Sequence, residues 1–132
     1  MSHFTTIKTK ITDPIALKKA LTDLGYSVIE EGYNLPLYGY QGDRRSQTAD
    51  IVVRRQYISG LSNDLGFKKK GNTYEMIISE YDVRLLGQDF IDRLMQRYAY
   101  HKVLSEAKRQ NWTKVKEEKM QDGTIKLVLT KY

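Results

Sequence analysis

The segment from Phe90 to His101 constrains the fold most, because its apolar side chains recur with the period of an α-helix. At about 100° per residue, one side of this helix carries Phe90, Ile91, Leu94, Met95, Tyr98 and His101. The sequence therefore predicts a long helix that begins after Gly87, ends near Asn111 and packs one face on a core.

A second helix is marked by local signals near the start of the chain. Asp13 is a good N-cap residue, Pro14 suits the first helical position, and Gly25 can adopt the left-handed conformation that ends a helix. The apolar stripe of this helix is formed by Leu17, Ala20, Leu21 and Leu24. The preceding segment, from Phe4 to Thr12, alternates apolar and polar residues as a half-buried strand does.

Further strands are predicted by short runs of β-branched and aromatic residues, and the segment from Gly32 to Thr48, with Pro36 and three glycines, is expected to be mostly loop. These strands are 26–30, 49–55, 65–69, 74–80, 112–118 and 124–132. The order strand, helix, strand, strand thus occurs twice, and two such units are one interpretation of it. Residues 1–132 are predicted to form a single α+β domain, a mainly antiparallel sheet with two helices on one face and the other face open.

Composition excludes several classes of site. The 132 residues include no cysteine, so disulfides, thiolate metal ligands and cysteine nucleophiles are absent. His3 and His101 are the only histidines, and neither has neighbours with metal-ligand spacing. Because the sequence also has no nucleophile motif, we expect no metal, no cofactor and no catalysis. No apolar run approaches the roughly 20 residues of a membrane span, so a soluble chain without a span is expected.

The net charge of +6 is unevenly distributed. Residues 44–70 contain seven basic and two acidic residues, and residues 100–132 contain eight basic and four acidic residues. The rest of the chain is slightly acidic. If the two basic segments meet in space, they would form a positive surface suited to an acidic protein or to nucleic acid. An ordinary solvated surface is the alternative interpretation.

The candidate binding residues follow from this charge and from the long helix. They are Arg44, Arg45, Arg54, Arg55, Lys68, Lys69 and Lys70, together with Tyr98 and His101. Tyr98 and His101 continue the apolar stripe of the helix to its rim, where they serve the core or line a pocket between helix and sheet. Val103, Leu104 and Ala107 lie off that stripe, so they either pack on the following hairpin or offer an apolar patch to a partner.

Three functions are compatible with these residues. The first is a small non-catalytic accessory protein that binds another protein with an acidic surface through its basic sheet face and tyrosine-bearing loops. The second is an RNA- or DNA-binding module in which the arginines and lysines contact phosphates. The third, a small-molecule enzyme, would require a concave pocket that contains both Tyr98 and His101. The sequence leaves the oligomeric state open.

A series of short motifs along nearly the whole chain resembles the hypothetical chloroplast reading frame family numbered thirty-five, of plastids and cyanobacteria. The motifs are Met1-Ser2-His3-Phe4, Leu24-Gly25-Tyr26, Gly39-Tyr40, Ala49-Asp50-Ile51-Val52, Leu65-Gly66-Phe67, Gln96-Arg97-Tyr98-Ala99-Tyr100-His101 and Gly123-Thr124-Ile125. The resemblance implies a location in the plastid stroma or the cyanobacterial cytoplasm and a supporting role in photosynthetic cells. It carries over no catalytic or binding residue. The chain departs from the family pattern at 32–37 and 57–63, where it is longer.

Overall fold

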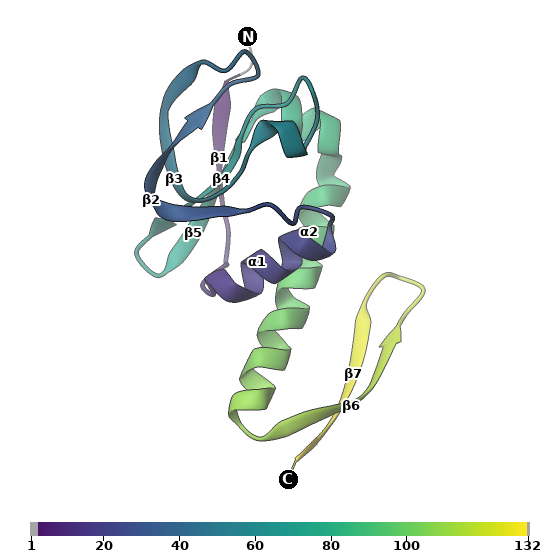
Figure 1. Cartoon of the computed structure of the whole chain (residues 1–132). Helices are drawn as coiled ribbons and strands as arrows, with labels where there is room; N and C mark the ends of the chain where they lie inside the picture. The colour runs from purple at the N-terminus through teal and green to yellow at the C-terminus, as the bar shows by residue number, and fades with distance from the viewer. Residues whose placement is uncertain (1–2, 132) are drawn as a thin grey trace.

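The computed structural model describes residues 3–131 (Figure 1). Along this part of the chain lie two α-helices, seven strands and one short 3₁₀ helix. The elements are β1 (Phe4–Lys8), α1 (Pro14–Asp23), β2 (Glu30–Tyr38), β3 (Arg44–Val53), η1 (Arg55–Tyr57), β4 (Leu65–Lys70), β5 (Thr73–Ser79), α2 (Glu80–Arg109), β6 (Trp112–Lys119) and β7 (Ile125–Lys131). The expected end of the last strand at Tyr132 lies outside the described residues.

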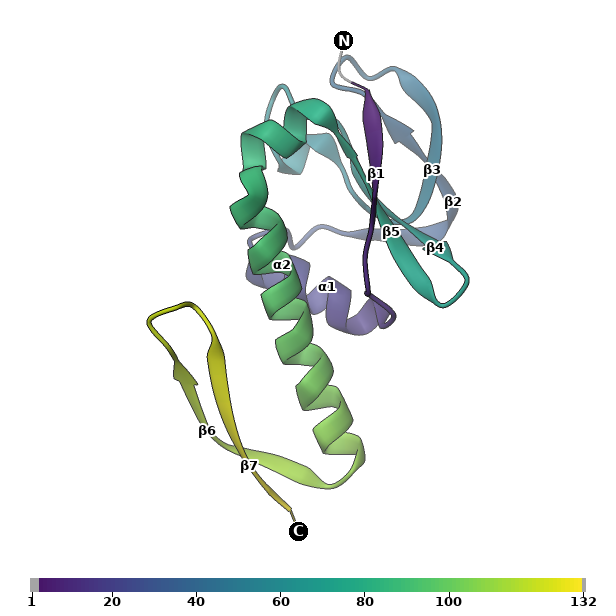
Figure 2. The same ribbon diagram turned by 180° about the vertical axis from the view of Figure 1, so that it is seen from behind.

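Five strands form one antiparallel sheet in the order β1-β5-β4-β3-β2, and β6 and β7 form a separate antiparallel hairpin. The α+β class and the mainly antiparallel sheet are confirmed. The order strand, helix, strand, strand does recur along the chain. However, its second strand pair stands apart from the main sheet, beside the C-terminal half of α2 (Figures 1 and 2).

Both helices cover one face of the five-stranded sheet, as expected from their apolar stripes (Figure 2). Leu17 and Leu21 of α1 and Leu94 of α2 are fully buried against Phe67 and Met76 of the sheet. The local signals for α1 are confirmed as well. The Asp13 carboxylate accepts hydrogen bonds from two N–H groups of the first turn, and the helix ends just before Gly25, which has a φ of 101°.

α2 begins with a short helical segment before Gly87 that the apolar periodicity does not indicate. Ser79 caps it, because the Ser79 hydroxyl accepts a hydrogen bond from the backbone N–H of Asp82 at 3.0 Å. The helix then passes through Gly87, whose φ of 75° and ψ of 173° are not helical and produce a kink. Gly87 thus separates a short helical segment, 80–86, from the long segment, 88–109. The predicted start of the long segment after Gly87 is confirmed, and the short segment before it was not predicted.

The segment expected to be a loop forms a long hairpin. β2 and β3 pair from Glu30 opposite Val52 to Tyr38 opposite Arg44, with two register shifts. Only residues 39–43, which include Gly39 and Gly42, form the turn between the two strands. Conversely, the strand expected at 26–30 begins only at Glu30. Residue propensity predicted a loop because proline and glycine disfavour strands. The strand forms nevertheless, because its pairing with β3 and its packing outweigh these propensities.

The second face of the sheet is not open as expected. The β2–β3 hairpin curls across it, as the bent ribbons of these strands show (Figure 1). Leu37, Ala49, Val52 and Ile77 form a second buried cluster there, with Phe4 and Leu35 packed at its edge. Lys68 and Lys70 lie on the same side of β4 as Gly66, beyond this cluster. The expectation of a wholly wet, positively charged face was therefore wrong.

Candidate functional site

Arg54, one of the predicted binding residues, serves the fold. Its guanidinium donates to Asp64 at 2.8 Å, to Glu30 at 2.7 Å and to the carbonyl oxygen of Pro36 at 2.7 Å. The side chain of Asp64 is 1% exposed, so Arg54 supplies the countercharge of a buried carboxylate. A phosphate or a partner's carboxylate would have to break this network to bind Arg54.

The other predicted basic residues divide into engaged and exposed side chains. Arg45 lies 2.6 Å from Asp43 and stacks over the ring of Phe4, and Lys68 lies 3.9 Å from Asp50 and over the ring of Tyr33. Arg55 is half-buried at the start of η1. The exposed members are Arg44, Lys69 and Lys70. The seven basic residues thus do not converge on one site.

Tyr98 and His101 join α2 to α1 and its N-terminal loop. The hydroxyl oxygen of Tyr98, a buried side chain, accepts hydrogen bonds from the backbone N–H groups of Thr12 at 2.8 Å and Asp13 at 3.1 Å. His101 Nε2 lies 2.6 Å from Asp23 Oδ2, which also accepts a hydrogen bond from Arg97 at 2.9 Å. Both side chains therefore have packing roles that account for their positions.

The Asp23 contacts predict a pH dependence. Burial raises the pKa of Asp23, but the hydrogen bonds from His101 and Arg97 together lower this pKa by more than burial raises it. The pKa of Asp23 therefore lies below its ordinary value of 3.8. A carboxylate with a depressed pKa stabilises the fold above that ordinary value, and the stabilisation is lost as the pH falls through the folded-state pKa. Between pH 5 and pH 3, urea unfolding should show a larger loss of stability for the wild type than for Asp23→Asn. As a control, Asp89→Asn, at a carboxylate 80% exposed, should behave like the wild type. Equal losses for the wild type and Asp23→Asn would contradict the assignment.

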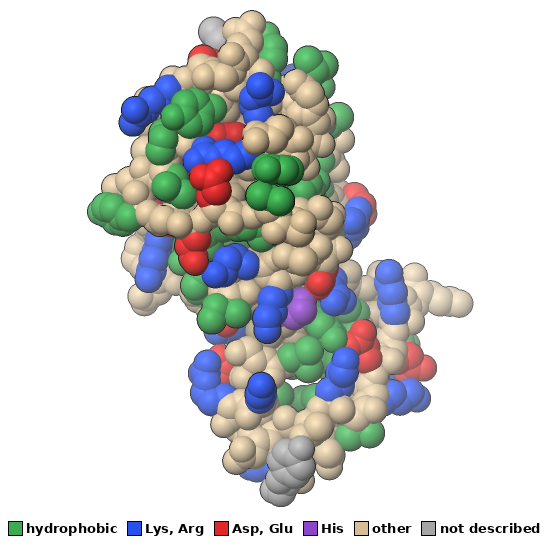
Figure 3. Space-filling model, in the orientation of Figure 1, with side chains coloured by type: hydrophobic (Ala, Val, Ile, Leu, Met, Phe, Trp, Pro, Cys, Tyr) green, Lys and Arg blue, Asp and Glu red, His purple; other side chains and the backbone are tan. Residues whose placement is uncertain are grey.

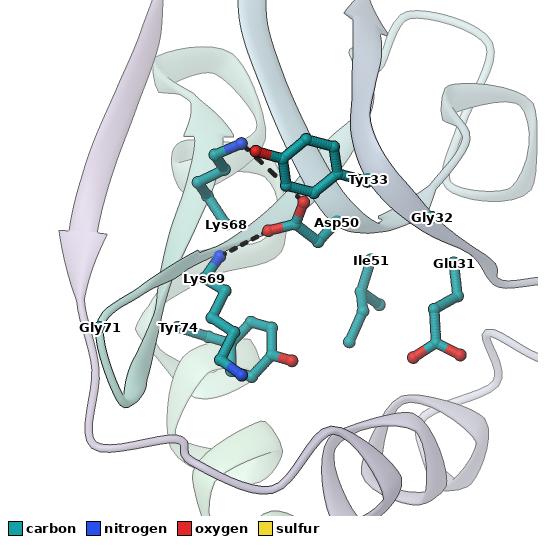
Figure 4. A pocket seen from close by; sticks show the side chains of 9 residues that line it. All are labelled: Glu31, Gly32, Tyr33, Asp50, Ile51, Lys68, Lys69, Gly71 and Tyr74. Carbon is teal, nitrogen blue, oxygen red and sulfur yellow. Dashed lines mark hydrogen bonds and ion pairs between the residues drawn. The ribbon is translucent and has the colours of Figure 1, made fainter.

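A shallow pocket of about 460 Å³ lies where β2 and β3 meet the β4–β5 turn (Figure 4). Two predicted residues, Lys68 and Lys69, line it. Asp50 at its centre accepts hydrogen bonds from the backbone N–H groups of Asn34 at 3.1 Å and Lys69 at 2.8 Å, which fixes the irregular part of β2. Since Asp50 and Glu31 balance the two lysines, the pocket has no strong preference for a charged ligand.

A more distinctive surface is the groove between α2 and the C-terminal hairpin, here called the hairpin groove. Two clefts of about 330 and 220 Å³ follow one another along it, and Val103 lines both. The α2 residues that line the groove are Gln96, Ala99, Tyr100, Lys102, Val103, Glu106, Ala107 and Gln110, and those of the hairpin are Trp112, Thr124, Ile125, Leu127 and Leu129. Figure 3 shows hydrophobic side chains around a hollow between helix and hairpin. The groove is thus apolar and open.

The hairpin that forms this groove has no buried residue in β6 or β7. Ile125, Leu127 and Leu129 are half-buried, so the predicted buried face exists but is incompletely covered. Val103 on the opposite wall is 45% exposed. Of the off-stripe residues of α2, Ala107 is buried and Leu104 half-buried beside the hairpin, as the first alternative predicted, whereas Val103 stays exposed. The second alternative, an apolar patch for a partner, stays a prediction.

Basic residues outnumber acidic residues in the part of the chain that forms the hairpin and half of the helix wall. The segment 100–132, which includes half of α2's wall and the whole hairpin, has a net charge of +4. Glu106, which lines the groove, is paired with both Lys102 and Arg109 at 3.3 Å. Lys114 on β6 donates to the hydroxyl of Tyr100, which also lines the groove, at 3.2 Å and so joins β6 to α2. An apolar groove with basic surroundings suits an apolar segment that carries acidic residues.

The fold and the groove describe a small α+β protein with a projecting β-hairpin. Residues 20–128 match the model of a family described as "Protein of unknown function (DUF1257)", and the chain belongs to this family. Relatives called "Uncharacterized protein ycf35" from Pyropia yezoensis and Cyanophora paradoxa are each 32% identical to it, and one from Guillardia theta is 31% identical. Each alignment covers 100% of this chain and 98% of the relative. No solved structure matches the chain.

These matches confirm the family that the sequence motifs resemble. The relatives are plastid-encoded proteins. Within residues 3–131, neither helix combines the length and the apolar character needed to cross a membrane.

Proposed function

We propose that this chain is a non-catalytic accessory protein that binds an acidic partner protein in the hairpin groove. The observation that carries the proposal is the exposed apolar lining of the groove, with Val103 at its centre, inside a segment of net charge +4. Exposed apolar surface that is rimmed by charge is typical of interaction sites. Its charge favours a partner of opposite sign and raises the rate of encounter.

The ionisable groups outside the groove support a binding role more than a catalytic one. Tyr98 and His101, the residues on which an enzyme was hypothesised to depend, hold the helices together through Thr12, Asp13 and Asp23. A general acid or base has to reach a substrate, and these side chains are committed to internal partners. We therefore propose that the chain performs recognition in the plastid stroma or the cyanobacterial cytoplasm.

The proposal can be tested by capture with a matched control. Val103→Glu places a charge in the groove, whereas Leu85→Glu changes an equally exposed apolar residue, 48% against 45%, in the first turns of the same helix. Wild type and Leu85→Glu should retain the same protein from a plastid or cyanobacterial extract, and Val103→Glu should lose it. The retained protein, once purified, should bind the wild type directly. Equal retention by all three chains would refute the groove as the binding site.

The nucleic-acid alternative is a separate outcome. Labelled single-stranded RNA is titrated with the wild type at low and moderate salt. Binding that weakens steeply with salt and is unchanged by Val103→Glu would assign the chain to nucleic acid instead. We expect no such binding, because Arg54, Arg45 and Lys68 already have internal partners.

A further inference from the structure

We infer that the partner segment binds as an extended strand, which pairs with the free edge of β7 and lays alternate apolar side chains into the hairpin groove. This inference rests on the proposed function and specifies how the same groove is occupied. Its first support is the topology. β6 and β7 pair only with each other within residues 3–131, so the backbone N–H and C=O groups along the outer edge of β7 are open to another strand.

The second support is which edge adjoins the groove. Thr113 and Lys114 of β6 line a separate cleft against Leu104 and Lys108 of α2. Ile125, Leu127 and Leu129 of β7 line the two clefts of the groove, which Val103 shares. The outer edge of β7 is therefore the edge beside the groove. A strand added there would continue the two-sided alternation of β7, with one set of side chains facing Ala99 and Val103.

The third support is the match of lengths. The groove wall from Gln96 to Gln110 is roughly 21 Å long at the rise of an α-helix. The seven residues of β7 span roughly 23 Å at the rise of a strand. An extended segment of about seven residues thus fits the whole groove. It would also add a third strand to a hairpin without buried residues, an arrangement that is marginally stable by itself.

Lysine side chains at the groove indicate which residues the partner segment carries. Lys126 lies on the outer face of β7, between the groove-facing Ile125 and Leu127, and it is exposed. An acidic residue on the outer face of an added strand would lie beside it as a cross-strand pair. Lys102 lies on the groove wall of α2. A second copy of this chain fits less well, because two segments of net charge +4 would then meet. The favoured occupant alternates apolar and acidic residues.

The probe for this inference is a fluorescein-labelled nine-residue peptide of alternating valine and glutamate, measured by fluorescence anisotropy. We expect the wild type and Leu85→Glu to bind it with equal affinity. Val103→Glu should bind about tenfold more weakly or worse, because it brings a like charge into an apolar site. A peptide with lysine in place of glutamate should lose binding to a similar degree, and added salt should weaken the glutamate peptide.

Backbone methylation tests the strand pairing itself. In an extended peptide, the N–H groups of successive residues point to opposite edges, so methylating the valine nitrogens blocks one edge and methylating the glutamate nitrogens blocks the other. One methylated peptide should lose binding while the other keeps it. Equal binding of both would overturn strand addition while leaving the proposed function intact, as would no peptide binding by a chain that still captures its partner through Val103. A dimer in sedimentation velocity that Val103→Glu dissociates would assign the groove to a second copy and overturn the inference.

Discussion

Replacing Arg54 with methionine is expected to lower the free energy of unfolding by about 3 to 5 kcal/mol, the usual cost of removing one partner of a buried ion pair. Asp64 would keep its two hydrogen bonds from the backbone N–H groups of Tyr38 and Arg55, both at 2.8 Å. It would nevertheless remain a carboxylate that is 1% exposed and has lost its countercharge. Urea unfolding at neutral pH measures the effect.

Two further variants identify the cause. Glu30→Gln removes the other partner of Arg54, but the Glu30 side chain is 49% exposed, so a loss of no more than about 1 kcal/mol is expected. Adding Asp64→Asn to Arg54→Met removes the uncompensated charge and should recover part of the stability. If Arg54→Met costs no more than Glu30→Gln, the carboxylate of Asp64 does not depend on Arg54, and the arginine becomes available for binding.

The same residue shows why the charge of segment 44–70 does not by itself define a binding site. A count of charge along the chain includes Arg54 but cannot show that Glu30, 24 positions away, and Asp64 lie against it. These contacts exist only once β2, β3 and the start of β4 are assembled. Net charge thus predicts the sign of the surface around a segment, and pairing between distant residues decides which cations remain available.

The accuracy of the fold prediction also varies with the range of the interactions involved. Asp13 and Gly25 fixed α1 correctly, because caps act through the backbone of adjacent residues. β2 was missed because Leu37 acquires its partners from β3 and β4, far along the chain. Val103 signalled the groove by its position off the main stripe. No sequence pattern indicates how far the C-terminal hairpin lies from α2, so the exposure of Val103 could not be predicted.

The second large effect on stability is expected at Gly66, which lies against Ala49 and Leu37 of the curled β2–β3 hairpin. A Cβ atom at this position would lie 2.6 Å from Cβ of Ala49 and 3.1 Å from Cδ1 of Leu37. Gly66→Ala should therefore destabilise the protein by about 1 to 3 kcal/mol, because a closely packed core has to shift to admit a methyl group. Gly60→Ala is the matched control, since a Cβ atom there meets no other atom within 4 Å.

A double-mutant cycle separates this clash from a general loss at Gly66. Ala49→Gly removes the atom that the new methyl group meets, so the double variant should be more stable than the sum of the two single effects predicts. Additive losses would mean that Cβ of Ala49 lies farther from a Cβ atom at position 66 than 2.6 Å. A positive coupling would instead establish that the hairpin is pressed onto Gly66 in solution. The contact belongs to the buried cluster of Leu37, Ala49, Val52 and Ile77, so the coupling would measure the packing that covers this part of the second face.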